Sequence, residues 1–333
     1  MTTIATLLSG GEGVGVGARM VGLDHLWGIE YDDAIAQVAR ANGFHTITAD
    51  VTAVDFAPLP APDILHASPP CPNFSVAKTN RGETEQDRAI AGAVCAAIET
   101  LLPRVFTLEN VRGYAGSESL KRIGETLMAL DYAVETFVVN AADYGVPQTR
   151  ERLFLVARRG GWMRAPLLLP RKTRWIGWYE AIADILDTLP PSQFAPWQLA
   201  RLPDELRESV LMDGTEMRKN GVQCAPEPPA HTVKAESYKG VPRAFIVNGT
   251  SDMAINGATK PAQTVVSTIH SKVPRAAVHG RVVAMTPRAL ARFQSFPDEY
   301  MLPDKKALAC RIIGNAVPPK LYAALIGAVL EQI

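Results

Sequence analysis

Residues 3–13, TIATLLSGGEG, join a short apolar run to a turn rich in glycine. The run at 3–9 predicts a buried β-strand, because it is short and glycines bound it. A second apolar run at 25–31 is followed by a helical spacing of apolar residues at 33–41. A strand, a glycine-rich turn and then a strand followed by a helix predict a sheet built from βαβ units.

The same alternation continues through the first half of the chain. Further strands are predicted at 63–68, 104–108, 133–139 and 153–157, and helices at 85–102 and 120–130. Strands separated by helices of this length favour an α/β fold with a mainly parallel sheet. Ligands of such sheets bind at the carboxyl ends of the strands, so residues that follow strands are the first candidates for a site.

The composition changes after about residue 160, where prolines and basic residues become frequent. The segments PEPPAHTV (226–233) and TKPAQTV (259–265) each resemble a proline-led turn that enters a β-strand. Thr286 and Pro287 then form an N-cap and N1 proline pair, which is typical of a helix start. A final apolar stretch at 318–333 has helical spacing.

These changes predict an interrupted catalytic domain. Residues 1–164 are expected to form the catalytic and ligand-binding domain, and 165–278 a smaller, loop-rich inserted domain that contains β-strands. Residues 279–333 are expected to return to the first domain. A chain of 333 residues is long enough for two domains of ordinary size.

Composition limits the class of protein. The formal net charge is zero, which argues mildly against a large nonspecific grip on nucleic acid but not against a local basic cleft. Four cysteines stand far apart with no CxxC pair, so we expect no metal site and a reduced, cytoplasmic protein. We also expect no membrane span and no signal peptide.

The sequence SPPCPNFS (68–75) directly follows a predicted strand, where active sites of such sheets are found. Prolines on both sides of Cys71 restrict the path of the chain around its thiol. Rigid placement suits a nucleophile, whose angle of attack matters. A buried structural cysteine on a turn is the alternative, and it is the commoner state of a single cysteine.

Two further segments place polar side chains at strand ends. FTLENV contains Glu109 and Asn110, and a carboxylate in that position can act as an acid or a hydrogen-bond partner. QTRER contains Arg150 and Arg152 at alternate positions entering a strand, so both point to one face. Two guanidiniums can bind an acceptor oxygen or lower the pKa of a nearby thiol. Taken singly, each could be a surface salt-bridge residue.

Taken together and in this order, the segments resemble those of the cytosine-C5 DNA methyltransferases. The matching segments are LLSGGEG, GIEYD (28–32), AD (49–50), PPCPNFS, ENV, QTRER, RALARFQSFP (288–297) and IGNAVPP (313–319). The resemblance covers nearly the whole chain except the inserted domain. It implies a Rossmann-like methyltransferase sheet that uses S-adenosylmethionine, with a target-recognition domain inserted into it.

The resemblance also implies a mechanism and a role for each catalytic residue. Cys71 would attack C6 of a flipped-out cytosine, so that C5 becomes nucleophilic enough to take a methyl group. Glu109 would hold N3 and the exocyclic amine, and Arg152 would bind the O2 oxygen. Arg150 would support the Cys71 loop and the base. Asn110 would brace the same loop through its backbone.

The first two strands predict where the implied cofactor, S-adenosylmethionine, binds. Glycine lets the backbone approach a ligand closely, and Glu30 ends the second strand, where a carboxylate can accept both ribose hydroxyls. Asp50 can take the adenine amine, and Tyr31 can pack on the ring. The expected cofactor-binding residues are Leu8, Gly10, Gly11, Gly13, Glu30, Tyr31, Asp50, Val51, Pro70, Asn315 and Val317.

The chain departs from the family's usual pattern at the first motif. An aspartate and a phenylalanine are usual where this chain has Thr6 and Leu8, and a glycine is usual at Glu12. The family's phenylalanine stacks on the adenine, whereas Leu8 offers only dispersion. The residue after the nucleophile is commonly glutamine, and here it is Pro72. The catalytic residues all match.

Double-stranded DNA is the expected partner, bound by a monomer. The inserted domain would read bases with Arg, Lys, Asn, Gln or Thr side chains, and the polar loop after Cys71 would close over the DNA. The expected DNA-binding residues are Ser75, Lys78, Arg81, Gln148, Asn248, Thr250, Lys272 and Arg275. A cognate restriction endonuclease is a further candidate partner.

Three alternatives stay open at this point. A tRNA cytosine methyltransferase could share the same catalytic set, although a recognition domain of this size favours DNA. An inactive binding module would keep the fold, but Cys71, Glu109 and Arg152 are all present. A nicotinamide-dependent oxidoreductase would explain the first strands, and nothing after residue 60 supports it.

Overall fold

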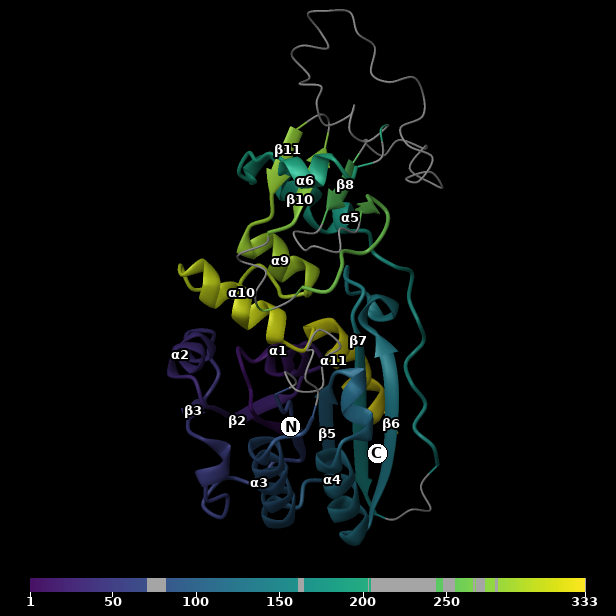
Figure 1. Ribbon diagram of the computed structural model, residues 1–333. Helices are drawn as coiled ribbons and strands as arrows, with labels where there is room; N and C mark the ends of the chain where they lie inside the picture. Colours follow the sequence, from purple (N-terminus) through teal and green to yellow (C-terminus); the bar gives the residue numbers. More distant parts are fainter. Residues whose placement is uncertain are drawn as a thin grey trace, which may run out of the picture.

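The structure is a computed structural model, and it describes residues 1–70, 82–160, 165–202, 204, 244–247, 255–265, 267, 273–278 and 281–332. Figure 1 shows a large sheet with its helices below a smaller sheet, joined by α9 (Pro287–Phe293) and α10 (Lys306–Asn315). Several expected site residues lie outside the described residues: Cys71, Ser75, Lys78, Arg81, Asn248, Thr250 and Lys272.

The large sheet has seven strands in the order β3-β2-β1-β4-β5-β7-β6. They are β1 (Thr3–Leu7), β2 (Asp24–Glu30), β3 (Thr46–Thr48), β4 (Ile64–Ala67), β5 (Val105–Asn110), β6 (Tyr132–Asn140) and β7 (Glu151–Arg159). The strands from β1 to β5 pair in parallel, and β7 runs antiparallel to both of its neighbours. The predicted mainly parallel α/β sheet is confirmed. Its order reverses between β1 and β4, where ligands of such sheets bind.

Helices cover both faces of this sheet. On one face, Ala5 and Leu7 of β1 pack in the same core as α3 (Glu85–Leu101) and α4 (Glu118–Ala129). On the other face, Ile4 packs in the same core as α1 (Gly13–Met20) and α11 (Pro319–Leu330). Successive strand residues point to opposite faces, which is why one apolar strand serves both cores. The helices predicted at 85–102, 120–130 and 318–333 are confirmed as α3, α4 and α11, whereas α1 is a helix that the sequence does not predict.

Glycine explains why the sequence does not predict α1. The helix carries Gly13, Gly15 and Gly17, and glycine in a helix interior is destabilising. Here close packing requires it. A Cβ added to Gly13 would lie 2.4 Å from the carbonyl oxygen of Val317, and one added to Gly17 would lie 2.5 Å from that of Pro319. The glycines therefore let the backbones of α1 and the C-terminal segment touch.

The smaller sheet has four antiparallel strands in the order β11-β10-β8-β9. They are β8 (Ala244–Val247), β9 (Ile255–Gly257), β10 (Arg275–Val278) and β11 (Arg281–Ala284), with short helices α5 (Trp178–Ile182), η4 (Ala183–Thr188) and α6 (Pro196–Leu199) nearby. Because β11 pairs with β10, this sheet extends beyond the expected boundary at residue 278. An inserted, β-containing region is thus confirmed, with its last strand in the segment that was expected to return.

The core of the smaller sheet is continuous with the C-terminal helices. Trp178, Ile246 and Val283 pack in one cluster with Phe293 of α9 and Cys310 of α10. The N-cap and proline signal at the start of α9 is confirmed, since Thr286 Oγ1 accepts a hydrogen bond from the Ala289 amide at 3.3 Å. The inserted region therefore sits on α9 and α10, which anchor it to the large sheet.

The segment at 259–265 does not form the strand that its proline-led start predicts. It makes a single parallel bridge between Gln148 and Ala262. The amide of Thr149 donates to the carbonyl of Ala262 at 2.8 Å, and the amide of Ala262 donates to the carbonyl of Pro147 at 2.9 Å. Its neighbours are residues 147–149, which directly precede β7. We call residues 147–150 together with 259–265 the seam, because they join the large sheet to the smaller one.

The C-terminal helices are core elements. The stretch Lys306–Leu330 is long and apolar enough by composition to cross a membrane, with a mean hydropathy of 1.3. However, 72% of its most apolar window is buried inside the protein. It consists of two helices, α10 and α11, and α11 packs directly on α1 on one face of the large sheet. Burial against the rest of the chain accounts for its apolar character.

Candidate functional site

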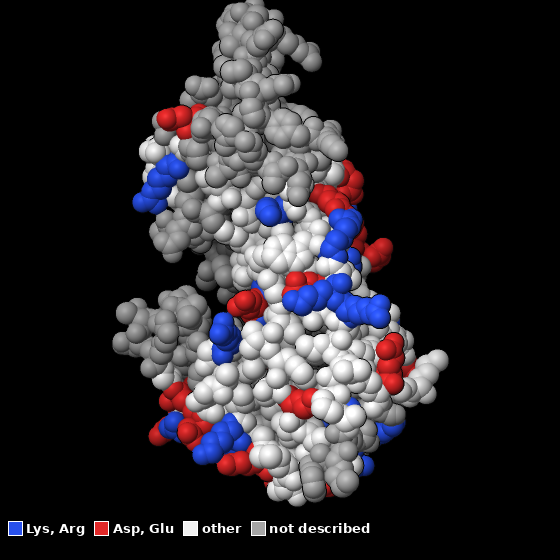
Figure 2. Space-filling model, turned by 90° about the vertical axis from the view of Figure 1, so that its right-hand side faces the viewer, with Lys and Arg blue, Asp and Glu red and all other residues white. Residues whose placement is uncertain are grey.

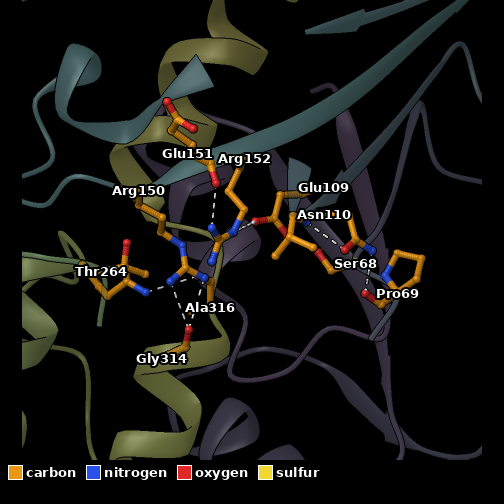
Figure 3. A network of polar contacts seen from close by, with 12 residues as sticks. Ser68, Pro69, Glu109, Asn110, Arg150, Glu151, Arg152, Thr264, Gly314 and Ala316 are labelled. Atoms are coloured by element: carbon orange, nitrogen blue, oxygen red, sulfur yellow. Dashed lines mark hydrogen bonds and ion pairs between the residues drawn. The ribbon is translucent and has the colours of Figure 1, made fainter. Parts of the chain in front are cut away.

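The end of β4 leads directly toward the predicted nucleophile. Ser68 continues the strand, since its amide donates to the carbonyl of Leu7 at 3.3 Å. Asn110, at the end of β5, donates from Nδ2 to the carbonyl of Pro69 at 3.0 Å, and its Oδ1 accepts the amide of Val111 at 2.8 Å. The side chain of Asn110 thus holds the chain two residues before Cys71 (Figure 3). A brace of this kind through the backbone is what the sequence predicts for Asn110.

A buried ion pair lies beside this brace. Arg152 Nε is 3.0 Å from Glu109 Oε1, and the two side chains are only 14% and 8% exposed. Glu109 is the last residue but one of β5, and Arg152 is the second residue of β7, the antiparallel neighbour of β5 in the sheet. Figure 3 shows the two side chains pointing at one another from adjacent strands. The pair therefore presents an acceptor and a donor side by side, fixed by two sheet strands.

Arg150 binds elsewhere, although it lies only two residues from Arg152. It is almost fully buried, and its guanidinium donates to the carbonyls of Val265, Gly314 and Ala316 at 3.0 to 3.1 Å. These carbonyls belong to the 259–265 seam and to the end of α10 (Figure 3). Arg150 therefore joins three chain segments, and a contact between it and a base stays a prediction that this geometry does not favour.

Gln148 is also directed into the protein. Its Nε2 donates to Gln294 Oε1 at 2.7 Å and to the Phe293 carbonyl at 3.2 Å, and its Oε1 accepts the Val265 amide at 2.7 Å. Gln294 in turn donates to the carbonyl of Ile313 at 2.7 Å. Gln148 was expected to contact DNA, but it is fully buried here. The structure gives it a place in the seam instead.

Arg275 is the other expected DNA-contact residue among those described. It is half-buried on β10, and its guanidinium donates to Ser192 Oγ at 3.0 Å and Gln198 Oε1 at 3.3 Å. Figure 2 shows basic and acidic side chains interleaved over one face of the molecule, in keeping with a formal net charge of zero. Recognition of DNA by Arg275 stays a prediction.

The glycine-rich turn meets Glu30 at the carboxyl ends of β1 and β2. The amide of Gly10 donates to Glu30 Oε2 at 2.8 Å, and the amide of Asp32 donates to Oε1 at 2.9 Å. Burial raises the pKa of Glu30, while these two amide bonds oppose the rise. A carboxylate has about four lone-pair sites, so each oxygen can accept one further hydrogen bond. Glu30 therefore both fixes the turn and retains acceptor capacity.

The turn has room for a ligand on its open side. Gly10 has a φ of 56°, and a Cβ built on it would meet no atom within 4 Å. Asp50 follows β3, and its Oδ1 accepts both the amide and the hydroxyl of Thr52, which lowers the pKa of Asp50. Open space above a glycine turn, with two carboxylates at the ends of neighbouring strands, fits a nucleoside with two ribose hydroxyls and an amine.

The remaining expected cofactor residues are divided between surface and core. Tyr31 is 74% exposed, and Pro70 and Asn315 are also exposed, whereas Val51 and Val317 are buried. Val317 approaches the turn from the C-terminal segment, because its carbonyl limits the space at Gly13. Tyr31 is thus free to pack on a ring, while Val51 and Val317 shape the walls from within.

The sequence analysis missed two polar anchors. Tyr300 donates from its hydroxyl to the carbonyl of Gly11 at 2.6 Å, across 289 residues. His66 on β4 is fully buried between Thr107 Oγ1 and Ser68 Oγ, each 2.8 Å from a ring nitrogen. Burial lowers the pKa of His66 to about 3. No short motif marks either residue, because their partners are brought close only by the fold.

Comparison with known proteins gives a consistent result. The family model for C-5 cytosine-specific DNA methylases matches residues 2–331. Type II methyltransferase M.NlaX of Neisseria lactamica is 29% identical over 318 residues, which cover 91% of this chain and 86% of that protein. Type II methyltransferase M.HhaI of Haemophilus parahaemolyticus is 25% identical over 317 residues, covering 93% and 89%.

Solved structures share the fold. A prophage-encoded E. coli protein assigned as a DNA modification methyltransferase superimposes with a TM-score of 0.69 at 19% identity, covering 100% of this chain and 99% of that one. Spodoptera frugiperda DNMT2 superimposes with a TM-score of 0.63 at 15% identity, covering 99% and 100%. Because this family model matches nearly the whole chain, from residue 2 to residue 331, the chain belongs to the C-5 cytosine-specific DNA methylase family.

Proposed function

We propose that the protein is a DNA (cytosine-5-)-methyltransferase that methylates C5 of a flipped-out cytosine through a covalent bond between Cys71 and C6. The observation that carries the proposal is the buried Glu109–Arg152 pair beside the braced exit of β4. Membership of the family supports the reaction class. The carboxylate and the guanidinium, held side by side, support cytosine as the base that is bound.

The pair matches one edge of cytosine. That edge offers an exocyclic amine as donor, the N3 nitrogen as acceptor, and the O2 oxygen as acceptor. The carboxylate of Glu109 can accept from the amine and share a proton with N3, and the guanidinium of Arg152 can donate to O2. Their mutual ion pair at 3.0 Å already sets the two groups side by side. Binding of this edge requires the base to leave the duplex.

The chemistry then follows from the electronics of the ring. Addition of the Cys71 thiolate to C6 forms a C–S bond, and the displaced electron pair makes C5 nucleophilic, while a proton held by Glu109 at N3 neutralises the charge. After C5 has been methylated, a base removes the C5 proton, the C5–C6 double bond re-forms and the thiolate leaves. S-adenosylmethionine, when bound, would supply the electrophilic methyl group to C5 and would leave as S-adenosylhomocysteine.

The cofactor residues belong to the same proposal. Glu30 and Asp50 would hold the ribose and the adenine amine, and Gly10 would let the backbone approach the ligand. Tyr31 would cover the ring. The protein would act in the cytoplasm as a monomer on double-stranded DNA, with a cognate restriction endonuclease as its counterpart.

A mechanism-based trap tests this proposal. Duplex DNA that carries 5-fluorocytosine blocks the final proton removal, so an active enzyme with S-adenosylmethionine stays covalently attached. We expect a stable adduct on duplex DNA and none on tRNA that carries the same base. An adduct on tRNA alone would replace DNA with RNA as the substrate, and the absence of any adduct would favour a binding module.

The nucleophile is tested by Cys71→Ser. A hydroxyl is a far poorer nucleophile than a thiolate, so we expect this variant to bind duplex DNA but to form no adduct and no methylated product. The matched control is Cys95→Ala, which removes a buried free thiol from α3 and should leave adduct formation at the wild-type level. Turnover by Cys71→Ser near the wild-type rate would refute the assignment.

A further inference from the structure

A buried carboxylate lies beneath the glycine-rich turn. Glu12 is fully buried, and its Oε1 accepts a hydrogen bond from Thr6 Oγ1 at 2.8 Å and lies 3.1 Å from His25 Nε2. Thr6 belongs to β1, Glu12 precedes α1 and His25 belongs to β2. One side chain thus ties two strands to the start of a helix.

Two glycines provide the space for this carboxylate. A Cβ added to Gly28 on β2 would lie 2.0 Å from Glu12 Oε1 and 2.7 Å from Thr6 Oγ1. A Cβ added to Gly15 on α1 would lie 2.7 Å from Glu12 Oε2. Any larger residue at either position would displace the carboxylate. The departures from the family pattern at Thr6 and Glu12 are therefore two parts of one built arrangement.

The backbone of the turn is held in an unusual conformation. Leu8, Gly10 and Glu12 all have positive φ, at 57°, 56° and 60°. Non-glycine residues rarely adopt this region, and glycine would be the unstrained choice at position 12. The side-chain contacts of Glu12 offset this strain. The same turn binds Glu30 through the Gly10 amide, so the position of the Glu12 backbone is coupled to the expected cofactor site.

We propose that Glu12 is a positioning residue for the cofactor, and that its buried carboxylate, held by Thr6 and His25, fixes the turn at residues 8–12 in the ligand-binding conformation. This inference rests on the proposed function for the identity of the ligand. The contacts of Glu12 lie on β1 and β2, beneath the turn, so we expect it to act through the backbone of the turn rather than by touching the ligand. Oε2 has no hydrogen-bond partner among the described residues, so Oε1 carries the contacts.

Basic side chains from two elements lie close to Glu12. His25 lies at hydrogen-bond distance, and Arg19 on α1 interacts with Glu12 through its charge. The guanidinium of Arg19 lies 3.6 Å from the ring centroid of Phe44, and that ring packs edge-on against His25. Among the described residues, the hydroxyl of Tyr300, which donates to the carbonyl of Gly11, is a third titratable group close to Glu12. The carboxylate therefore lies among side chains from β2, α1 and the segment between α9 and α10.

Glu12→Gly is the decisive variant, because the two explanations of Glu12 predict opposite results. If Glu12 were merely tolerated at a glycine position, removing its side chain would relieve backbone strain and leave ligand binding unchanged. If it positions the turn, we expect the dissociation constant for S-adenosylhomocysteine to rise about tenfold, which is about 1.4 kcal/mol. Calorimetry on the apo protein measures this without turnover, and hydrogen exchange at residues 8–13 should become faster.

Companion variants separate positioning from general damage. Thr6→Val removes one hydroxyl at nearly constant shape and should weaken binding less than Glu12→Gly does, and Glu12→Gln, which keeps an acceptor oxygen, should also retain more affinity. The matched control is Glu135→Gln, which breaks the ion pair between Glu135 on the outer strand β6 and Arg158 on β7 and should not change ligand affinity.

Three results distinguish the possible failures. Wild-type protein that does not bind S-adenosylhomocysteine would overturn the proposed cofactor and, with it, this inference. Wild-type binding together with equal binding by Glu12→Gly would overturn the inference alone. Duplex DNA affinity should stay within about twofold of wild type in every variant, since a change of that size is below 0.5 kcal/mol. A parallel loss of DNA affinity would mean that Glu12 supports the whole fold rather than the turn.

Discussion

The large sheet and the seam to the smaller sheet use buried polar side chains in different ways. In the large sheet, buried side chains bind other side chains on adjacent strands, as in Glu109 with Arg152 and His66 with Thr107. In the seam, Gln148 and Arg150 bind mainly backbone groups from distant parts of the chain. The first arrangement orients functional groups, whereas the second fixes how chain segments join.

Because of this difference, substitutions in the large sheet are expected to act on activity, and substitutions in the seam on stability. Changing a side-chain pair in the large sheet leaves every backbone hydrogen bond in place, so activity should fall while folding survives. Changing a seam residue leaves buried carbonyls or amides without partners, which destabilises the protein directly. Arg150 and Arg152 are two residues apart and fall on opposite sides of this divide, so they provide the most direct comparison.

The largest expected effect is on activity. Glu109→Gln keeps the size of the side chain but removes the charge and the ability to transfer a proton, so kcat should fall about 100- to 1000-fold. Single-turnover methylation of duplex DNA measures this, with DNA affinity measured in parallel. The control is Glu151→Gln, an exposed neighbour of Arg152, and its activity should match the wild type. A loss of less than threefold in Glu109→Gln would remove Glu109 from the mechanism.

Arg150→Met should act mainly on stability. It leaves the buried carbonyls of Val265 and Gly314 without the donor that Arg150 supplies, so the free energy of unfolding should fall by about 3 kcal/mol. Urea denaturation measures this value. Arg152→Lys is the comparison variant: it keeps a cation beside the buried Glu109 and leaves no buried carbonyl without a donor, so it should lose more activity and less stability. Equal losses of stability in the two variants would mean that buried polar side chains in the large sheet and in the seam stabilise the protein to the same extent.

The sequence predicts the large sheet better than the seam, for a physical reason. Strand residues such as Ile4 and Ala5 lie between two layers of helices, so each strand must be apolar throughout, and that pattern is visible locally. The seam depends on the meeting of Gln148 with Gln294, which are 146 residues apart. No local pattern encodes such a contact, so Gln148 was assigned to DNA.

The candidate site shows the same division. Glu109 and Asn110 are the last two residues of β5 and Arg152 is the second residue of β7, so their convergence follows from the order of the sheet. Arg150 was expected beside them because alternate strand residues share a face, but its long side chain reaches instead to the end of α10. Strand periodicity predicts the face on which a residue lies. It does not predict which of several acceptors on that face a guanidinium will bind.

The buried imidazole of His66 should make the free energy of unfolding depend on pH. The pKa of about 3 lies below the ordinary value of 6.5 because the imidazole is buried. The unfolded chain therefore binds a proton below pH 6.5 that the folded protein does not bind, and stability is lost as the pH falls from about 6.5 to 3. Between pH 7 and pH 5, wild-type protein should lose about 2 kcal/mol through this group.

His66→Gln provides the comparison for that measurement. The variant has no titrating group at this position, so its free energy of unfolding in urea should fall less between pH 7 and pH 5, by about the same 2 kcal/mol. A control at His45, which is exposed, should behave like the wild type when changed to Gln. Identical pH dependence in the His66 variant and the wild type would mean that His66 titrates normally in the folded state.

The smallest expected effect concerns the open side of the glycine-rich turn. Leu8 has a φ of 57°, and Leu and Phe bear the same backbone strain there, so Leu8→Phe changes little except the presence of a ring. Stacking of that ring on adenine should tighten S-adenosylmethionine binding by roughly 0.5 to 1.5 kcal/mol. Leu8→Met, which adds no ring, should leave the affinity measured by calorimetry unchanged. Weaker binding by Leu8→Phe would place the adenine away from residue 8, and the ligand would then depend on Glu30 and the Glu12-supported backbone alone.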